Sequence, residues 1–202
     1  MTLNRATADG VIRCWPTPVY RRQHDTMGDA QGVNEALADH IRRRSREEPS
    51  AKASNLGAWQ SRADLLRGDA PAVSRLAEWI SEAVAALERL VLATPWEAGH
   101  PVAEAWGMLY RARDAQGVHV HPGSVWSGVY YVEVPELEGE RGALELFDPR
   151  TARRVRHATG IHRIVPSSGL LVAFPSWLEH RVRPHDSPRE RIAVAFNVGY
   201  RR

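Results

Sequence analysis

Three histidines and one arginine have a spacing that suits metal chemistry. His119 and His121 are two residues apart, and on an extended chain such residues point to the same face. His180 and Arg191 follow much later in the chain. Imidazole is a good ligand for iron, copper, nickel and zinc. The pattern therefore predicts a metal site whose ligands come from two distant segments.

Arg191 predicts a second part of the same site. It opens the apolar run Arg191–Asn197, which is typical of a strand in a β core. A buried guanidinium without a partner is costly, so this arginine needs a carboxylate or a phosphate. Three protein ligands would also leave metal positions free for a substrate and O₂. These residue types suggest a redox metal beside a site for a dicarboxylate.

The elements that position these residues differ between the two halves of the chain. Apolar residues recur at three- and four-residue steps over Asn34–Arg46 and Ala70–Leu92, which predicts two amphipathic helices. Between them, Asn55–Ser61 has the composition of a loop and contains a tryptophan that we expect to be buried.

Short extended runs replace the helical period after Pro101. Gly, Pro, Asp and Ser separate them at the spacing expected of a β-sandwich or barrel. We predict one domain over residues 1–202, with a helical part over about 11–98 packed outside a β core over about 101–200. The predicted strands are Val102–Arg111, Val118–Val120, Val125–Val134, Ala143–Phe147, Ile161–Val165, Leu170–Phe174, His180–Arg183 and Arg191–Val198.

Composition excludes several classes of protein. The 202 residues include a single cysteine, Cys14, which excludes an internal disulfide and a zinc site built on paired cysteines. No apolar run is long enough to cross a membrane, and the first residues do not have the pattern of a signal peptide, so we expect a cytoplasmic protein. The formal net charge is +3, but the arginines are scattered among acidic residues, which disfavours nucleic-acid binding.

The motifs and their order resemble a bacterial family of 2-oxoglutarate/Fe(II)-dependent oxygenases of the double-stranded β-helix fold, which is cupin-like. The likeness covers about residues 11–200. It is carried by His119–Ser124, Ser127–Val132, Phe147–Arg150, Phe174–Trp177 with His180, Arg191–Asn197, Trp15–Tyr20 and Gly57–Ser61.

The resemblance implies roles for the four residues. Iron in the wider superfamily is held by a His-X-Asp/Glu pair and a distal histidine, while a distal arginine binds 2-oxoglutarate. Carried over, His180 is the distal ligand and Arg191 the anchor of the co-substrate. His121 stands where the carboxylate is expected. Either His119, His121 and His180 all bind iron, which we favour, or His121 is the first of only two histidine ligands. Water or a carboxylate, with Asp148 and Glu179 as candidates, would then complete the coordination.

The implied activity is oxidation, such as hydroxylation, of an unactivated C–H bond with Fe(II), 2-oxoglutarate and O₂, which releases succinate and CO₂. The expected substrate is a small molecule or of amino-acid type. Tyr131 is a second expected contact of 2-oxoglutarate, with Tyr130 as the alternative. The expected residues of the substrate pocket are Trp106, Trp126, Trp177 and Asn197.

Other interpretations stay open at this point. A cupin-like dioxygenase could use the same three histidines without 2-oxoglutarate, although it would not need Arg191. A non-catalytic β-barrel binding module is a further alternative for the function. A homodimer is an open alternative for the oligomeric state. A basic cluster is expected in a loop at the barrel mouth and suggests an anionic substrate; it consists of Arg153, Arg154 and Arg156, with His157. A protein side chain is an equally open alternative for the substrate.

Overall fold

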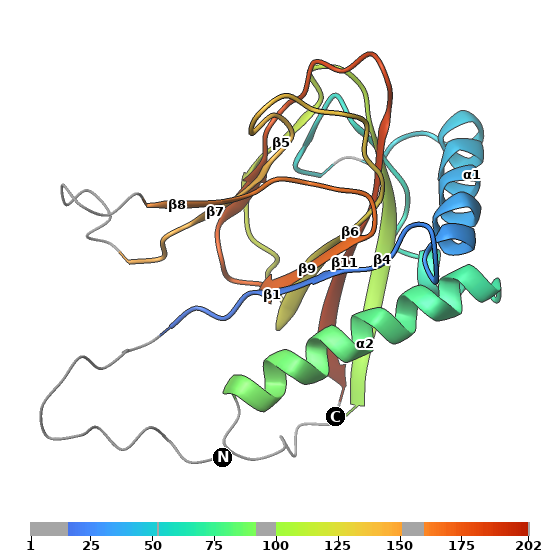
Figure 1. The fold of residues 1–202 in the computed structure, drawn as a ribbon. Helices are drawn as coiled ribbons and strands as arrows, with labels where there is room; N and C mark the ends of the chain where they lie inside the picture. Colours follow the sequence, from blue (N-terminus) through green and yellow to red (C-terminus); the bar gives the residue numbers. More distant parts are fainter. Residues whose placement is uncertain (1–15, 52, 92–99, 151–159, 202) are drawn as a thin grey trace, which may run out of the picture.

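Two antiparallel β-sheets face each other, and two helices cover the outer side of the larger one (Figure 1). This arrangement is seen in a computed structural model that describes residues 16–51, 53–91, 100–150 and 160–201. The predicted fold class, a mainly β jelly roll with helices packed outside it, is confirmed.

The larger sheet, called the major sheet, has the strand order β1-β9-β6-β11-β4-β3. The smaller one, the minor sheet, has the order β2-β5-β10-β7-β8. The helices are α1 (Gln31–Glu47) and α2 (Pro71–Val91), with a short 3₁₀ helix at Leu65–Arg67. The strands are β1 (Tyr20–Gln23), β2 (Asn55–Leu56), β3 (Trp59–Gln60), β4 (His100–Tyr110), β5 (Ala115–His119), β6 (Trp126–Glu133), β7 (Leu144–Phe147), β8 (Ile161–Ile164), β9 (Leu170–Pro175), β10 (His180–Val182) and β11 (Arg191–Arg201).

Strands of the major sheet are buried on both faces because each face packs against a different layer. On β9, Leu171 and Ala173 point towards the helices, whereas Leu170, Val172 and Phe174 point into the space between the sheets. Side chains alternate between the faces of a strand, so a strand buried on both sides is apolar throughout. This explains the continuous apolar runs in the C-terminal half.

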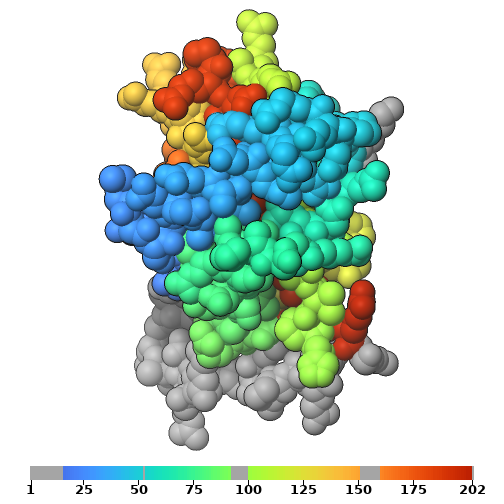
Figure 2. All heavy atoms as spheres, turned by 90° about the vertical axis from the view of Figure 1, so that its right-hand side faces the viewer, coloured from blue at the N-terminus to red at the C-terminus, as the bar shows by residue number. Residues whose placement is uncertain are grey.

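The helices bury one apolar stripe each on the outer face of the major sheet, and their blue to green atoms occupy the middle of the side seen in Figure 2. Helix α2 contributes Leu76 and Ile80, and α1 contributes Ile41. The contact is close at Gly107 on β4, where an added Cβ would lie 2.7 Å from Ile41 Cγ1. A side chain at this position would force the helix away from the sheet.

The segment between the helices differs from its prediction. Asn55–Ser61 was expected as a loop, but it holds the short strands β2 and β3, which add to β5 and β4. Trp59 is buried as expected, and its indole N–H donates to the carbonyl oxygen of Glu48 at 3.0 Å. Strand β1 was not predicted, because its charged sequence lacks apolar alternation. Cys14 and Trp15 lie outside the described residues.

No described helix combines the length and the apolar character needed to cross a membrane. The cellular compartment stays a prediction.

His24, which lies on the helix side of the major sheet, should make stability depend on pH. Its side chain is buried against Trp79, with ring centroids 4.0 Å apart, and neither ring nitrogen has a hydrogen-bond partner among the described residues. Burial, followed by the nearby charge of Arg22, lowers its pKa below the ordinary value of 6.5. The unfolded chain therefore takes up this proton at a higher pH than the folded protein, so stability falls as the pH drops below about 6.5.

His24→Phe should remove this component of the pH dependence. We expect the slope of unfolding free energy against pH below about pH 6.5 to become smaller, by at most about 1.4 kcal/mol per pH unit for the loss of one titrating group. Urea unfolding at several pH values measures it. His162→Phe, at an exposed position on β8, is the control and should leave the slope unchanged. An unchanged slope in His24→Phe would mean that His24 does not titrate differently in the folded protein.

Candidate metal centre and co-substrate cavity

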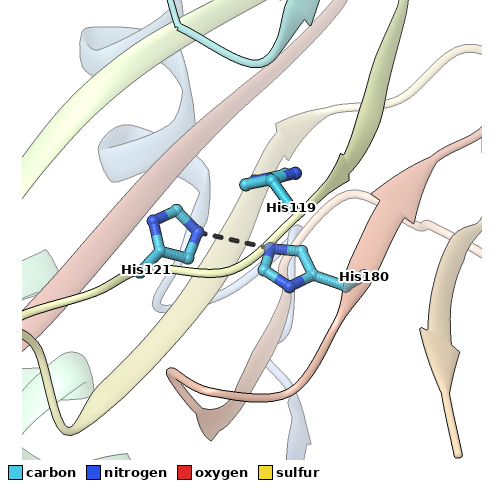
Figure 3. A group of neighbouring side chains, drawn as sticks. All are labelled: His119, His121 and His180. Carbon is cyan, nitrogen blue, oxygen red and sulfur yellow. Dashed lines mark hydrogen bonds between the residues drawn. The ribbon is translucent and has the colours of Figure 1, made fainter.

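The minor sheet brings the three predicted histidines together (Figure 3). His119 ends β5 and lies directly opposite His180, the first residue of β10, with ring centroids 4.2 Å apart. His121 follows in the next turn, where its backbone N–H donates to the carbonyl oxygen of Ser176 at 2.9 Å. Backbone contacts therefore position all three histidines without the help of a metal ion.

The ring nitrogens converge on one point between the side chains. The candidate ligand atoms all lie within 4.8 Å of one another, and Nε2 of His121 is 3.3 Å from Nε2 of His180. Nδ1 of His119 and Nδ1 of His180 each lie 2.8 Å from a backbone carbonyl oxygen, of Gly117 and Leu178 respectively. An Nδ1–H that donates to a carbonyl leaves the Nε2 lone pair free for a metal, so these contacts select the coordinating tautomer.

Burial keeps the three imidazoles in the form that binds metal. Desolvation, reinforced by the neighbouring His119, lowers the pKa of His121 to about 4 and that of His180 to about 3. The pKa of His119 is also lowered by burial. All three rings are therefore neutral at pH 7, and no proton has to be displaced when a cation binds.

The described residues bring no carboxylate into this group. Asp148 is engaged by Arg150, whose Nε donates to it at 2.8 Å. Glu179 is exposed, whereas its neighbour His180 is buried, because adjacent residues of an extended segment point to opposite sides. The geometry supports the three-histidine interpretation over one that needs either of these carboxylates.

Arg191 lies in the same cavity as the histidines and is fully buried. Its Nη1 donates to the carbonyl oxygen of Gly142 at 2.7 Å, and its Cζ lies 4.1 Å from the ring centroid of Tyr110. Nε and Nη2 have no hydrogen-bond partner among the residues that the structure describes. Two parallel donors on a buried cation match the two oxygens of a carboxylate.

Tyr131 adds a third free donor to this end of the cavity. Its hydroxyl is buried and has no partner within the described ranges, and burial raises its pKa to about 12, so it stays protonated. Tyr130 points the other way, where its hydroxyl donates to Oδ1 of Asn34 at 2.6 Å on helix α1. Of the two adjacent tyrosines, Tyr131 is thus the one that faces the cavity.

The cavity, of about 390 Å³, lies between the sheets. Paired residues of β4 and β11 line it: Tyr110 beside Arg191, Met108 beside Ala193, Trp106 beside Ala195, and Glu104 beside Asn197. The small side chains of Ala193 and Ala195 leave space between the two polar ends of β11. The lining includes Gln60 and Glu104, which were not predicted. Glu104 is two residues from Trp106 on β4, so both side chains point to the same face of the strand. This spacing could have identified Glu104 as a lining residue once Trp106 was expected in the pocket.

The three predicted tryptophans have different positions. Trp106 lines the cavity, and its ring centroid is 6.0 Å from that of His121. Trp126 does not line it, contrary to the prediction, because it lies on the face of β6 that packs with Tyr130 against the helices. Trp177 is likewise not among the described lining residues, and it is 55% exposed in the turn between β9 and β10. The cluster of Arg153, Arg154, Arg156 and His157 lies outside the described residues.

Asn197 lines the cavity and also contacts His121, one of the candidate metal ligands. Its amide nitrogen lies 3.4 Å from Nδ1 of His121, and the hydroxyl of Ser127 donates to its Oδ1 at 2.8 Å. The amide of Asn197 can also be turned by 180°, which exchanges its oxygen and nitrogen. In that orientation its oxygen accepts from Nδ1–H of His121, and its NH₂ group donates to the hydroxyl oxygen of Ser127. That orientation leaves Nε2 of His121 free for metal.

Asn197→Leu should therefore weaken metal binding by roughly 10- to 100-fold without abolishing it. Titration with Ni(II), followed by calorimetry, measures the change. Asn197→Asp keeps an acceptor for Nδ1–H and should retain more of the affinity than Asn197→Leu. Equal affinity of the wild type and Asn197→Leu would show that the contact does not orient His121.

Comparison with known proteins agrees with this geometry. Residues 104–197 match the family model described as "Putative 2OG-Fe(II) oxygenase". No curated protein sequence matches. Among solved structures, a Pseudomonas putida prolyl-4-hydroxylase is similar with a TM-score of 0.67 and 21% identity, over 92% of this chain and 94% of that chain.

Two further structures were crystallised with ligands. The viral collagen prolyl hydroxylase of Paramecium Bursaria Chlorella virus-1, in complex with 2-oxoglutarate, has a TM-score of 0.59 and 14% identity, over 89% of this chain and 95% of that chain. HygX from Streptomyces hygroscopicus, with nickel, 2-oxoglutarate and hygromycin B bound, has the same score and identity, over 91% and 83%. At these identities the likeness shows the fold.

Residues 104–197, which include the three histidines and Arg191, match the model of the 2-oxoglutarate/Fe(II)-dependent oxygenases, and the fold and the histidine group agree with that class. The resemblance stated from the sequence is thereby confirmed.

Proposed function

We propose that the protein binds Fe(II) through His119, His121 and His180, holds 2-oxoglutarate at Arg191 and Tyr131, and oxidises an unactivated C–H bond of a small-molecule or amino-acid-type substrate. The observation that carries the proposal is a set of buried donors in the cavity that have no hydrogen-bond partner among the residues that the structure describes. Such groups are costly unless a ligand satisfies them. A carboxylate accepts from Nε and Nη2 of Arg191 and from the hydroxyl of Tyr131.

The donor set also fits the metal. Three neutral imidazole nitrogens suit Fe(II) and leave coordination positions for a co-substrate and O₂. When bound, Fe(II) and 2-oxoglutarate supply the oxidising chemistry, which consumes O₂ and converts 2-oxoglutarate into succinate and CO₂ while the substrate is oxidised.

The protein contributes position and exclusion of water. Arg191 and Tyr131 would fix the distal carboxylate of 2-oxoglutarate, and the ring of Tyr110 below the guanidinium keeps Arg191 from turning away. Met108 and Phe174 line the middle of the cavity and keep it apolar. A dry cavity favours the charge-assisted contact at Arg191 and protects reactive species from water.

Arg191 supports the proposed reaction over that of a dioxygenase that uses the same histidines without 2-oxoglutarate. That reaction needs no anchor for a carboxylate, yet the cavity is lined by a buried guanidinium, two nitrogens of which have no hydrogen-bond partner among the described residues. Metal content alone distinguishes the proposed enzyme from a binding module, because the latter needs no metal.

Anaerobic addition of Fe(II) and 2-oxoglutarate should produce a weak visible charge-transfer band, and admission of air should yield succinate. Omission of either component is the control for the band. O₂ consumption that does not require 2-oxoglutarate would contradict the proposal and favour the direct dioxygenase. A protein that retains no iron or nickel would favour the binding module.

A further inference from the structure

The two ends of the cavity carry opposite charges. Among the described lining residues, Arg191 and Glu104 are the only side chains with a formal charge at neutral pH once the histidines are neutral. They lie at the two ends of the paired segments of β4 and β11, because Arg191 pairs with Tyr110 and Glu104 pairs with Asn197. Arg191 is fully buried and Glu104 is exposed, so the acidic end is the open one.

Glu104 is free to bind a ligand. Its carboxylate forms no ion pair or hydrogen bond with any residue in the described part of the chain, whereas most other acidic residues near the sheets are paired with arginine. Its register partner Asn197 contacts His121, so Glu104 lies on the same face of the sheet as Asn197, at the histidine end of the paired strands rather than at the Arg191 end.

Trp106 complements this carboxylate. It lies two residues along β4 and faces the cavity between Glu104 and the rest of the lining, with its ring centroid 6.0 Å from that of His121. An aromatic face beside a carboxylate is a good environment for an ammonium group, which gains both a cation–π contact and an ion pair. The side chain of Gln60 adds a neutral hydrogen-bonding group to the lining.

We propose that the substrate carries an amine that is protonated at neutral pH, and that this ammonium binds Glu104 and Trp106 at the open end of the cavity. This inference rests on the proposed function, since it names the substrate class of that site. It contrasts with the anionic substrate suggested by Arg153, Arg154 and Arg156. A carboxylate at this end would be repelled by Glu104, which also keeps 2-oxoglutarate from binding in the reverse direction.

Three probes of similar size and different charge test the proposal: cyclohexylmethylamine, cyclohexylmethanol and cyclohexanecarboxylate. Their affinities for the protein loaded with Ni(II) and 2-oxoglutarate can be measured by calorimetry or by fluorescence of the tryptophans. We expect the amine to bind at least about tenfold more tightly than the alcohol, with the carboxylate weakest. Equal binding of the three probes, preference for the carboxylate, or no binding of the amine would overturn the proposal.

Variants of Glu104 test whether its charge, rather than a change in the fold, causes the preference for the amine. Glu104→Gln should remove the preference for the amine, and Glu104→Lys should favour the carboxylate. Glu78→Gln, at an exposed position on helix α2, is the matched control and should behave as the wild type. Unchanged amine preference in Glu104→Gln would overturn the proposal. All variants should bind 2-oxoglutarate as the wild type does, which shows that the cavity is intact.

The same measurements separate this inference from the proposed function. A wild-type protein that binds Ni(II) but not 2-oxoglutarate contradicts the proposed function. A wild-type protein that binds both, yet shows no preference among the probes, contradicts only the assignment of Glu104.

Discussion

Replacing His180 with alanine should reduce metal affinity by more than about 100-fold and abolish 2-oxoglutarate turnover. The change removes one of three converging imidazoles, and the described residues bring no carboxylate into this group to replace it. Loss of a direct ligand should exceed the effect of losing a group that only orients one. Calorimetric titration with Ni(II) and the yield of succinate under Fe(II) measure the two losses. His162→Ala, at an exposed position on β8, is the control.

Variants of the other two histidines separate the two ligand sets. If all three bind, His119→Ala and His121→Ala should each lose metal affinity to a similar extent as His180→Ala. His121→Asp recreates the His-X-Asp pair of the wider superfamily and should retain metal, because a carboxylate supplies an oxygen ligand from the same position. Full metal affinity in His119→Ala would contradict the three-histidine site and favour His121 as the first of two histidine ligands.

Arg191→Met should weaken 2-oxoglutarate binding by roughly 100-fold while metal affinity stays the same. A charge-assisted pair in a buried site contributes about 3 kcal/mol, which corresponds to this factor. The variant also removes a buried cation that no described carboxylate neutralises, so the protein without ligand should be at least as stable as the wild type. Thermal melts with and without 2-oxoglutarate measure both effects, because the wild type should be stabilised by 2-oxoglutarate and the variant should not.

A second variant tests the anchor without removing it. Gly142 has a φ of 69°, and a Cβ added there would lie 2.6 Å from Nη1 of Arg191. Gly142→Ala should therefore displace the guanidinium and lower 2-oxoglutarate affinity less than Arg191→Met does. Gly139→Ala, with a φ of 57° but open space around its Cβ, is the control for backbone strain alone. Unchanged 2-oxoglutarate affinity in both Arg191→Met and Gly142→Ala would contradict the assigned anchor.

Much of the fold could be predicted because local patterns determine it. Helices α1 and α2 follow from their apolar stripes, and the strands of the β core follow from apolar runs bounded by turn residues. The convergence of His119 and His121 follows from their spacing on an extended chain. Their meeting with His180 was suggested by residue type and order and supported by the family resemblance, because the pairing of β5 with β10 is a long-range contact that no local pattern determines.

The remaining features depend on which face of a strand points inwards. Tyr130 and Tyr131 could not be separated by sequence, since both faces of β6 are buried, one against helices and one against the cavity. Trp126 was assigned to the wrong face for the same reason. Trp177 was expected in the pocket, but it lies in the turn between β9 and β10, where its side chain is exposed. Glu104 was overlooked because the alternation that places it on the same face as Trp106 does not by itself show which face of β4 points into the cavity.

Strand β11 contains positions that are held by contacts in the site and positions between them that only limit the size of the cavity. Its two polar positions in the cavity, Arg191 and Asn197, are held by contacts to Gly142, Tyr110, Ser127 and His121. Between them, Ala193 and Ala195 contribute little more than a methyl group each to the cavity. Larger side chains at these two positions would shorten or divide the cavity without touching a proposed ligand or the anchor. The strand thus offers two sites at which the size of accepted substrates can evolve independently of the reaction.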